Sequence, residues 1–271
     1  MSGSEGPWSG FRDVDGEAAA RANAAAWSAD ASEYLAEHGS TLGAADLVWC
    51  PEGLREADAH LLGDIEGLRG RLVVEVGAGA AQCSRWLTAQ GVRALATDVA
   101  EGMLAAARDL DRATGIRTPT LLADARALPL PDACADAVFT AFGAIPFVPD
   151  AHRVHAEAAR VLRPGGRWVA SVTHPARWMF PDDPTLAGTT VSRSYWDRRP
   201  YVETESGAVT YAEFHRTVGD HVRDVVAAGL RVVDIVEPRW PAGRDVVWGG
   251  WGPERGALVP GTLVLVAERP A

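Results

Sequence analysis

Short apolar runs alternate with amphipathic segments along most of the chain. Helical spacing of the apolar residues predicts helices over 81–90, 101–113, 150–162 and 218–228. Between and beside these helices, seven runs have the length and the β-branched or aromatic content of strands. They cover residues 72–76, 92–97, 119–123, 136–142, 167–172, 230–236 and 262–267. Strands that alternate with helices predict βαβ units, and therefore a parallel sheet that helices cover.

The alternation does not extend to the N-terminus, and it is interrupted after residue 173. The Ala-rich residues 15–38 predict one or two helices, and residues 53–63 predict another. A break of roughly 40 residues inside a compact domain usually has a function. We therefore expect one domain in five parts: a flexible tail (1–14), a helical cover (15–70), a sheet core (71–173), an insertion (174–216) and the C-terminal part of the same sheet (217–271).

Composition and charge narrow the class of protein. The net charge is −10 and the chain has no Lys, which argues against a nucleic-acid partner. No apolar stretch approaches the roughly 18 to 20 residues of a membrane span, and the polar, acidic start does not resemble a secretion signal. We expect a cytoplasmic protein. The wide spacing of Cys50, Cys83 and Cys134 predicts buried thiols, with neither a disulfide framework nor a metal site.

A glycine loop follows the first predicted strand. Gly77 and Gly79 allow a sharp turn that brings backbone N–H groups and the next helix N-terminus against a ligand. Asp98 ends the second strand, where an acid accepts hydrogen bonds from ribose hydroxyls. Glu75 lies in an apolar strand and is costly there unless it is paired with a cation or a hydrogen-bond donor. The ammonium group of an amino acid would be such a cation. The dinucleotide fingerprint fails because Gln82 stands where its third glycine belongs.

The segment from about Val73 to Val172 resembles the cofactor domain of class I S-adenosylmethionine-dependent methyltransferases. Ala81 departs from the family's first motif, which has a third glycine there. The matching positions are Glu75 to Gly79 in the first motif, Asp98 as the ribose-binding acid, Met103 against adenine, Asp124 and Ala125 at the adenine edge, and Arg160 to Gly166 before the fifth strand.

The resemblance implies a fold and a cofactor. The fold is a doubly wound, mostly parallel α/β sheet of seven strands in the order 3-2-1-4-5-7-6, with the last strand antiparallel, a helical cover and an insertion after strand five. The cofactor is S-adenosylmethionine, and the product is S-adenosylhomocysteine. The candidate cofactor-binding residues are Tyr34, Glu75, Gly77, Ala78, Gly79, Asp98, Met103, Asp124, Ala125 and Thr140.

The irregular segments are the candidate acceptor site. Methyl transfer is an in-line displacement in which positioning matters most, so a base is optional. His174, directly after the fifth strand, is the candidate base. Five of the ten Trp lie between residues 178 and 251, where they line a pocket, form a subunit interface or cover a sheet edge. The candidate acceptor-binding residues are His38, Phe142, Trp178, Tyr195, Trp196, Tyr201, Trp248 and Trp251.

Two alternatives to a methyltransferase stay open at this point. A nicotinamide-dependent reductase is one, although Gln82 and Glu75 count against it. The other is a non-catalytic S-adenosylmethionine-binding protein that acts as a partner subunit, because a preserved cofactor motif does not establish turnover. For the methyltransferase we expect a small, apolar or aromatic acceptor. The sequence leaves the acceptor atom and the oligomeric state open, a homodimer included.

Overall fold

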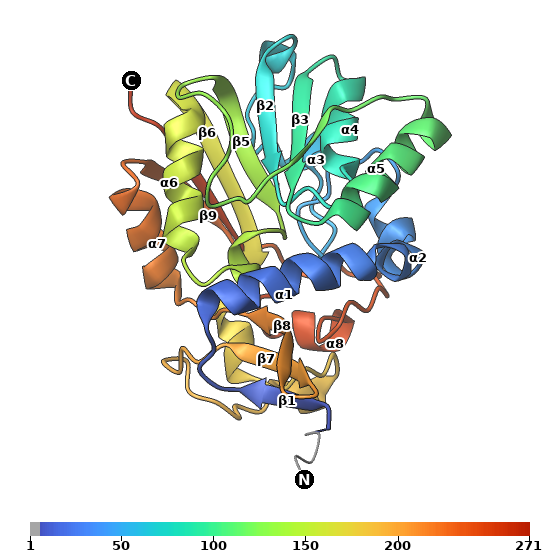
Figure 1. Cartoon of the computed structure of the whole chain (residues 1–271), viewed down its shortest axis with the longest axis vertical. Helices are drawn as coiled ribbons and strands as arrows, with labels where there is room; N and C mark the ends of the chain where they lie inside the picture. Colours follow the sequence, from blue (N-terminus) through green and yellow to red (C-terminus); the bar gives the residue numbers. More distant parts are fainter. Residues whose placement is uncertain (1–5) are drawn as a thin grey trace.

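A seven-stranded sheet forms the centre of the molecule in the computed structural model, which describes residues 6–271 (Figure 1). The strands lie in the order β4-β3-β2-β5-β6-β10-β9, and β10 is antiparallel to both of its neighbours. Numbered along the chain, this is the predicted order 3-2-1-4-5-7-6, which is confirmed. The strands are β2 (Leu72–Val76), β3 (Arg93–Asp98), β4 (Thr120–Leu122), β5 (Ala135–Ala141), β6 (Leu162–Thr173), β9 (Arg231–Val236) and β10 (Thr262–Glu268).

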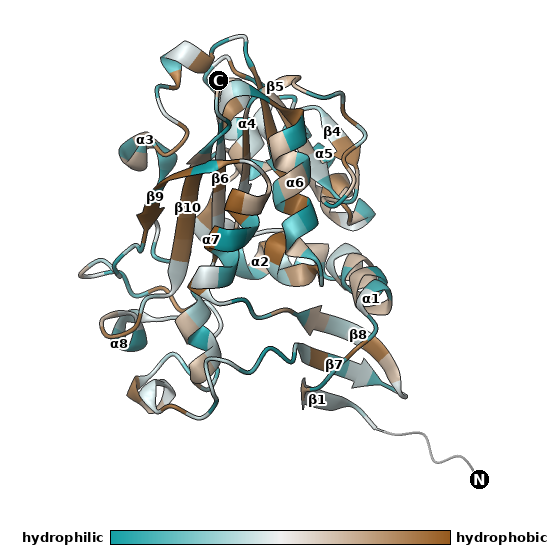
Figure 2. Ribbon diagram, turned by 90° about the vertical axis from the view of Figure 1, so that its left-hand side faces the viewer, coloured by the Kyte–Doolittle hydropathy of each residue, from teal (hydrophilic) through white to brown (hydrophobic). Residues whose placement is uncertain are grey.

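Helices cover both faces of this sheet. On one face Phe139 and Val169 pack in a cluster with Leu87 of α4. On the other face Val74 and Leu265 pack with residues of α6 and α7, which lie in front of the sheet in Figure 2. Because successive residues of a strand point to opposite faces, strands covered on both sides are apolar throughout. The helices are α4 (Gln82–Ala89), α5 (Glu101–Thr114), α6 (Ala151–Val161) and α7 (Val218–Ala227).

Two N-terminal helices, α1 (Gly16–Ala29) and α2 (Ala31–Leu42), confirm the helices predicted in residues 15–38. α1 begins at an N-cap, where the Asp15 carboxylate accepts a hydrogen bond from the Ala18 N–H at 2.7 Å. It then runs across the edge of the sheet at which the parallel strands have their carboxyl ends (Figure 1). Ligands of open α/β sheets bind at that edge, so α1 is placed to cover a ligand.

A second, antiparallel sheet lies below α1 in Figure 1. It pairs a strand near the N-terminus with two strands of the insertion. Its strands are β1 (Trp8–Phe11), β7 (Tyr201–Glu205) and β8 (Ala208–Glu213), in the order β1-β7-β8. Ser206 and Gly207 join β7 to β8 with positive φ angles of 51° and 80°, as in the turns that favour hairpins. The prediction of a flexible tail is therefore wrong for residues 8–11, and its residues 1–5 lie outside the described residues.

One further prediction is corrected by side-chain contacts. The helix predicted over 53–63 is limited to α3 (Glu56–Ala59), because the buried Glu56 carboxylate accepts hydrogen bonds from the N–H groups of Leu61 and Leu62 and folds the chain into a turn. Asp150 precedes α6 without capping it, since its carboxylate contacts Arg126 and Arg153.

Several short helices complete the structure, and they are named at the end of this paragraph. Within residues 6–271 no helix, short or long, is both long and apolar enough to cross a bilayer. In the same range no three His, Cys, Asp or Glu side chains are grouped to hold a metal ion. The short helices are α8 (Pro253–Gly256) and the 3₁₀ helices η1 (Glu66–Leu68), η2 (Ile145–Phe147), η3 (Pro175–Met179) and η4 (Leu186–Thr189).

Candidate active site

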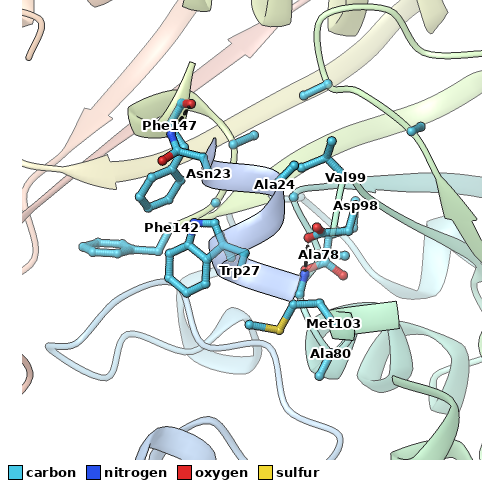
Figure 3. A pocket seen from close by; sticks show the side chains of 18 of the residues that line it. Asn23, Ala24, Trp27, Ala78, Ala80, Asp98, Val99, Met103, Phe142 and Phe147 are labelled. Carbon is cyan, nitrogen blue, oxygen red and sulfur yellow. Dashed lines mark hydrogen bonds between the residues drawn. The ribbon is translucent and has the colours of Figure 1, made fainter. Parts of the chain in front are cut away.

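A cavity of about 250 Å³ lies between α1 and the carboxyl edge of the sheet. Its walls come from α1, the β2–α4 loop, the ends of β3 and β4, and the segment that follows β5. Figure 3 shows Trp27 and Phe142 on one side of it, and Asp98 and Ala78 on the other. The volume is near the lower end of the range for small-molecule sites, and the position is the one expected for a doubly wound sheet.

The glycine loop after β2 is in backbone contact with the loop after β5. Gly77 has a φ of 67°, and a Cβ atom added to it would lie 2.6 Å from the Ala144 nitrogen. A Cβ atom on Gly143 would lie 2.3 Å from the Gly77 oxygen. Both positions therefore require glycine, and their contact places the Phe142 side chain at the cavity wall.

Strained backbone marks the same edge. Phe142 and Ala144 have φ angles of 63° and 48°, a region that non-glycine residues seldom adopt. Ala81, where the family has its third glycine, has a φ of 59° and is fully buried against Ala78. An alanine in this conformation costs about 1–2 kcal/mol, so this chain keeps the left-handed turn without the residue that favours it.

Two buried acids organise the glycine loop. Asp98 accepts hydrogen bonds from the Gly79 N–H at 2.7 Å and from the Ala100 N–H at 2.8 Å. Glu75 accepts from the backbone N–H and the hydroxyl of Ser84, at 2.9 and 2.5 Å. Burial raises the pKa of Asp98, and it raises the pKa of Glu75 to about 7 although the hydrogen bonds from Ser84 oppose this. A cationic ligand group would favour the ionised form of both acids.

A third acid at the cavity is held by an arginine. Asp124 accepts a hydrogen bond from the Arg126 backbone N–H at 2.8 Å, and its carboxylate pairs with the Arg126 guanidinium, also at 2.8 Å. Burial by itself raises the pKa of Asp124, but the hydrogen bonds from Arg126 outweigh it and the pKa is lowered. Asp124 therefore carries a fixed negative charge at the cavity wall.

The opposite end of the cavity is aromatic. Trp27 packs edge-on against Phe147 and Tyr34, with ring centroids 5.2 and 5.5 Å apart. Its Nε1 atom and the Nε2 atom of Gln82 are buried and have no hydrogen-bond partner among the described residues. Because buried donors are nearly always satisfied, two unpartnered donors in a cavity wall fit a ligand that supplies acceptors.

Most of the predicted cofactor residues line this one cavity. Among the predicted acceptor residues only Phe142 does. The predicted residues that line it are Tyr34, Glu75, Gly77, Ala78, Gly79, Asp98, Met103, Asp124, Ala125 and Phe142.

The other predicted residues lie outside the cavity lining. Thr140 is buried in β5, and its hydroxyl has no partner among the described residues. His174 is buried as well: its Nε2 contacts Glu237 at 2.8 Å, and its Nδ1 accepts from the Ala176 N–H. His38 stacks on Trp248, with ring centroids 3.9 Å apart. The remaining acceptor candidates lie in or beside the insertion or in the segment before β10, namely Trp178, Tyr195, Trp196, Tyr201 and Trp251.

Sequence reasoning did not single out the part of the site that α1 supplies. Trp27 and Asn23 line the cavity, as do Ala20 and Ala24. Their spacing of three, four and seven residues is that of one helix face. This spacing is a usable signal, although it cannot show which surface the face covers. Arg126, Cys83, Gln82 and Phe147 also line the cavity without having been predicted.

Comparison with known proteins shows similarity to methyltransferases. Residues 74–170 match a family described as "Methyltransferase domain". A "Ubiquinone/menaquinone biosynthesis C-methyltransferase UbiE" of Acidiphilium cryptum is 44% identical over 103 residues, which are 36% of this chain and 40% of that protein. The chain spans 40%, 46% and 63% of the length of three curated relatives that it matches.

Solved structures extend the likeness over most of the chain. An S-adenosylmethionine-dependent methyltransferase from Mesorhizobium loti is 25% identical with a TM-score of 0.58, over 77% of this chain and all of that one. A 1,6-didemethyltoxoflavin-N1-methyltransferase from Burkholderia thailandensis, solved with its acceptor and S-adenosylhomocysteine, is 18% identical with a TM-score of 0.63, over 98% of this chain and all of that one. At that identity the second likeness is one of fold.

Proposed function

The chain belongs to the class I S-adenosylmethionine-dependent methyltransferases, and we propose that it transfers the methyl group of S-adenosylmethionine to a small, apolar or aromatic acceptor. One continuous cavity supports the proposal, with glycines and acids at one end and aromatic rings at the other (Figure 3). S-adenosylmethionine, when bound, supplies an electrophilic methyl group on a sulfonium. The chain's part is to hold donor and acceptor in line.

We assign the cofactor to the end of the cavity that contains the glycine loop. Glu75 pairs with the ammonium group of the methionine part, and Asp98 accepts from the ribose hydroxyls. Asp124 and the backbone N–H of Ala125 contact the adenine edge. The fit rests on the glycine loop, on Glu75, Asp98 and Asp124 in the cavity lining, and on the Gln82 Nε2 atom, which has no partner among the described residues.

The acceptor then lies between Trp27, Phe142 and Phe147. Aromatic faces there suit a flat, apolar molecule and attract a sulfonium by cation–π interaction. Among the described residues, none of those that line the cavity is a histidine, and His174 lies outside the lining. We therefore propose that the acceptor brings its own reactive nucleophile, an ionised oxygen, a nitrogen or an activated carbon. The quinone named for the Acidiphilium cryptum relative supports including carbon nucleophiles on aromatic rings.

The test is methyl transfer from S-adenosylmethionine with a deuterated methyl group to a panel of hydroquinones, phenols and aromatic amines. We expect acceptor-dependent release of S-adenosylhomocysteine and a labelled product detected by mass spectrometry. Binding of S-adenosylhomocysteine without transfer to any acceptor would favour a binding protein. Binding of NADH or NADPH alone would contradict the proposal and favour a reductase.

A further inference from the structure

We propose that Arg126 is a positioning residue that fastens α1 over the cavity while it holds Asp124 at the adenine end. This inference rests on the proposed function. It assigns two tasks to the Arg126 guanidinium: orientation of Asp124, which recognises the adenosine part, and attachment of α1, which closes the site. Glu17 of α1 lies 109 residues from Arg126 in the sequence. Loss of the link should free α1 and speed the release of the adenosine ligand.

The geometry of Arg126 is that of a bridge. Its Nη1 atom lies 2.8 Å from Glu17 Oε1, in the first turn of α1, and 3.3 Å from Asp150 Oδ1. Its Nε atom is 3.1 Å from each carboxylate oxygen of Asp124, and its Nη2 atom is 2.8 Å from Asp124 Oδ2. A planar guanidinium is suited to hold two carboxylates at fixed angles, which a lysine ammonium cannot do.

The two halves of the bridge differ in exposure. The Arg126 side chain is 7% exposed, whereas that of Glu17 is 60% exposed. The contact with Glu17 is therefore screened by water and weak, while the contact with Asp124 is made by several hydrogen bonds. The link to α1 can open while Asp124 keeps its position.

Opening of α1 matters because α1 is a wall of the cavity. Ala20, Ala24 and Trp27 on α1 line it. Other polar contacts also hold the helix. The Asn23 amide donates to the Phe147 and Ala212 carbonyls and accepts from the Ala212 N–H, each at 2.8 Å. The Ser28 hydroxyl accepts from the Gly102 N–H at 2.8 Å. Glu17 is the attachment nearest the helix start, and it connects directly to a residue assigned to the ligand. We infer that an adenine held by Asp124 steadies Arg126, and through it α1.

The experiment measures three variants, Glu17→Gln, Arg126→Lys and the double variant that combines these two changes. A fourth variant, Glu33→Gln, is the control. Glu33 is the matched control, because it is an exposed acid in the first turn of the other cover helix, α2. Three quantities are measured: amide hydrogen exchange of residues 16–29 in the free protein, the dissociation rate of S-adenosylhomocysteine, and the ratio of its affinity to that of S-inosylhomocysteine, which lacks the adenine amino group.

Glu17→Gln should increase both the exchange of α1 and the dissociation rate by about two- to fivefold, as expected for a partly exposed ion pair, and should leave the affinity ratio unchanged. Arg126→Lys should also lower the ratio, because Asp124 loses its orientation. The double variant should be no worse than Arg126→Lys, and Glu33→Gln should match the wild type.

The inference is overturned if Glu17→Gln behaves like Glu33→Gln in both exchange and dissociation, or if Arg126→Lys leaves the affinity ratio unchanged. Failure of the wild type to bind S-adenosylhomocysteine would defeat the proposed function and the adenine half of this inference. The exchange comparison in the free protein would still decide whether Arg126 fastens α1.

Discussion

The sheet core and the cover above it are built in opposite ways. In the core, β2 lies beside β3 and β5, and the glycine loop, Asp98 and Asp124 follow strands that local sequence defines. Above the carboxyl edge of the sheet lie α1, α2 and the small sheet of β1, β7 and β8, which together are called the cover below. In the cover, segments that are neighbours in space are distant in sequence. Trp8 is paired with Thr204, and the Asn23 amide donates to the Ala212 carbonyl 189 residues further along the chain. The end of the cavity that we assign to the cofactor is therefore encoded locally, whereas the end that we assign to the acceptor is assembled from remote segments.

This difference has a consequence for function. Motifs that local backbone geometry fixes can stay the same while the cover changes, and the family can then change acceptors without changing its donor. Substitutions in the glycine loop should therefore affect cofactor binding first. Substitutions of the apolar α1 residues that line the cavity, such as Trp27, should affect the acceptor first.

The largest effect is expected from Gly77→Ala. The new methyl group would meet the Ala144 nitrogen at 2.6 Å in a backbone region that disfavours alanine. We expect a loss of about 2–4 kcal/mol in the free energy of unfolding and a loss of at least roughly 100-fold in affinity for S-adenosylhomocysteine. Denaturant unfolding and calorimetric titration measure the two.

Gly115→Ala is the control, because Gly115 has a φ of 72° and nothing within 4 Å of an added Cβ atom. It should show the backbone strain alone, about 1–2 kcal/mol, with unchanged affinity. Equal affinity losses in the two variants would mean that contact between the two loops does not shape the site.

Trp27→Ala should separate the two ends of the cavity. Removal of the indole takes away the ring that packs on Phe147 and Tyr34. We expect kcat/KM for the acceptor to fall by about tenfold or more, and the Kd of S-adenosylhomocysteine to change by less than about threefold. Trp86→Ala, a half-buried tryptophan of α4 outside the cavity lining, controls for lost stability. A larger effect on Kd than on kcat/KM would contradict the division into two ends.

A smaller effect concerns pH. Burial raises the pKa of Glu75 to about 7, so in the free protein its contribution to stability is present below its usual pKa and is lost as the pH rises through about 7. The ammonium group requires the ionised carboxylate, so affinity for S-adenosylhomocysteine should increase several-fold as the pH rises through about 7. Titrations between about pH 6 and 8 should show this slope in the wild type, but not in Glu75→Gln. An identical slope in both proteins would remove Glu75 from the ammonium site.

The smallest effect is expected from Trp196→Ala in the insertion. Trp196 is 72% exposed, so removal of its side chain should lower the free energy of unfolding by less than about 0.5 kcal/mol. We expect kcat/KM for the acceptor within about twofold of the wild type. A tenfold loss would show that the acceptor reaches the insertion, as the sequence suggested.

The cofactor half of the site could be predicted from the sequence because each of its parts acts through local geometry. A strand, a glycine turn and a helix fix where Gly77 and Gly79 lie, and an acid at the next strand end is carried to the same edge by the parallel sheet. The strand order followed from the resemblance, and the structure has it.

The acceptor half could not be predicted, for a physical reason. Whether Trp27 faces a cavity depends on where α1 lies, and that depends on the pairing of β1 with β7 and on packing against β8. The concentration of tryptophans after residue 173 predicts an acceptor site in the insertion, but Trp178 there packs against Phe11 of β1. The ion pair between Arg126 and Glu17 could not be predicted from the sequence, because the two residues lie 109 positions apart.

The most direct test of the cofactor site is thermal unfolding with S-adenosylhomocysteine, NADH and NADPH in separate samples. At about 100 times Kd a ligand adds roughly 2.7 kcal/mol, and for a chain near this size each kcal/mol raises Tm by about 2–4 °C. We predict a rise of roughly 5–10 °C with S-adenosylhomocysteine and none with either nicotinamide. A rise with a nicotinamide alone would contradict the assignment of this cavity to S-adenosylmethionine.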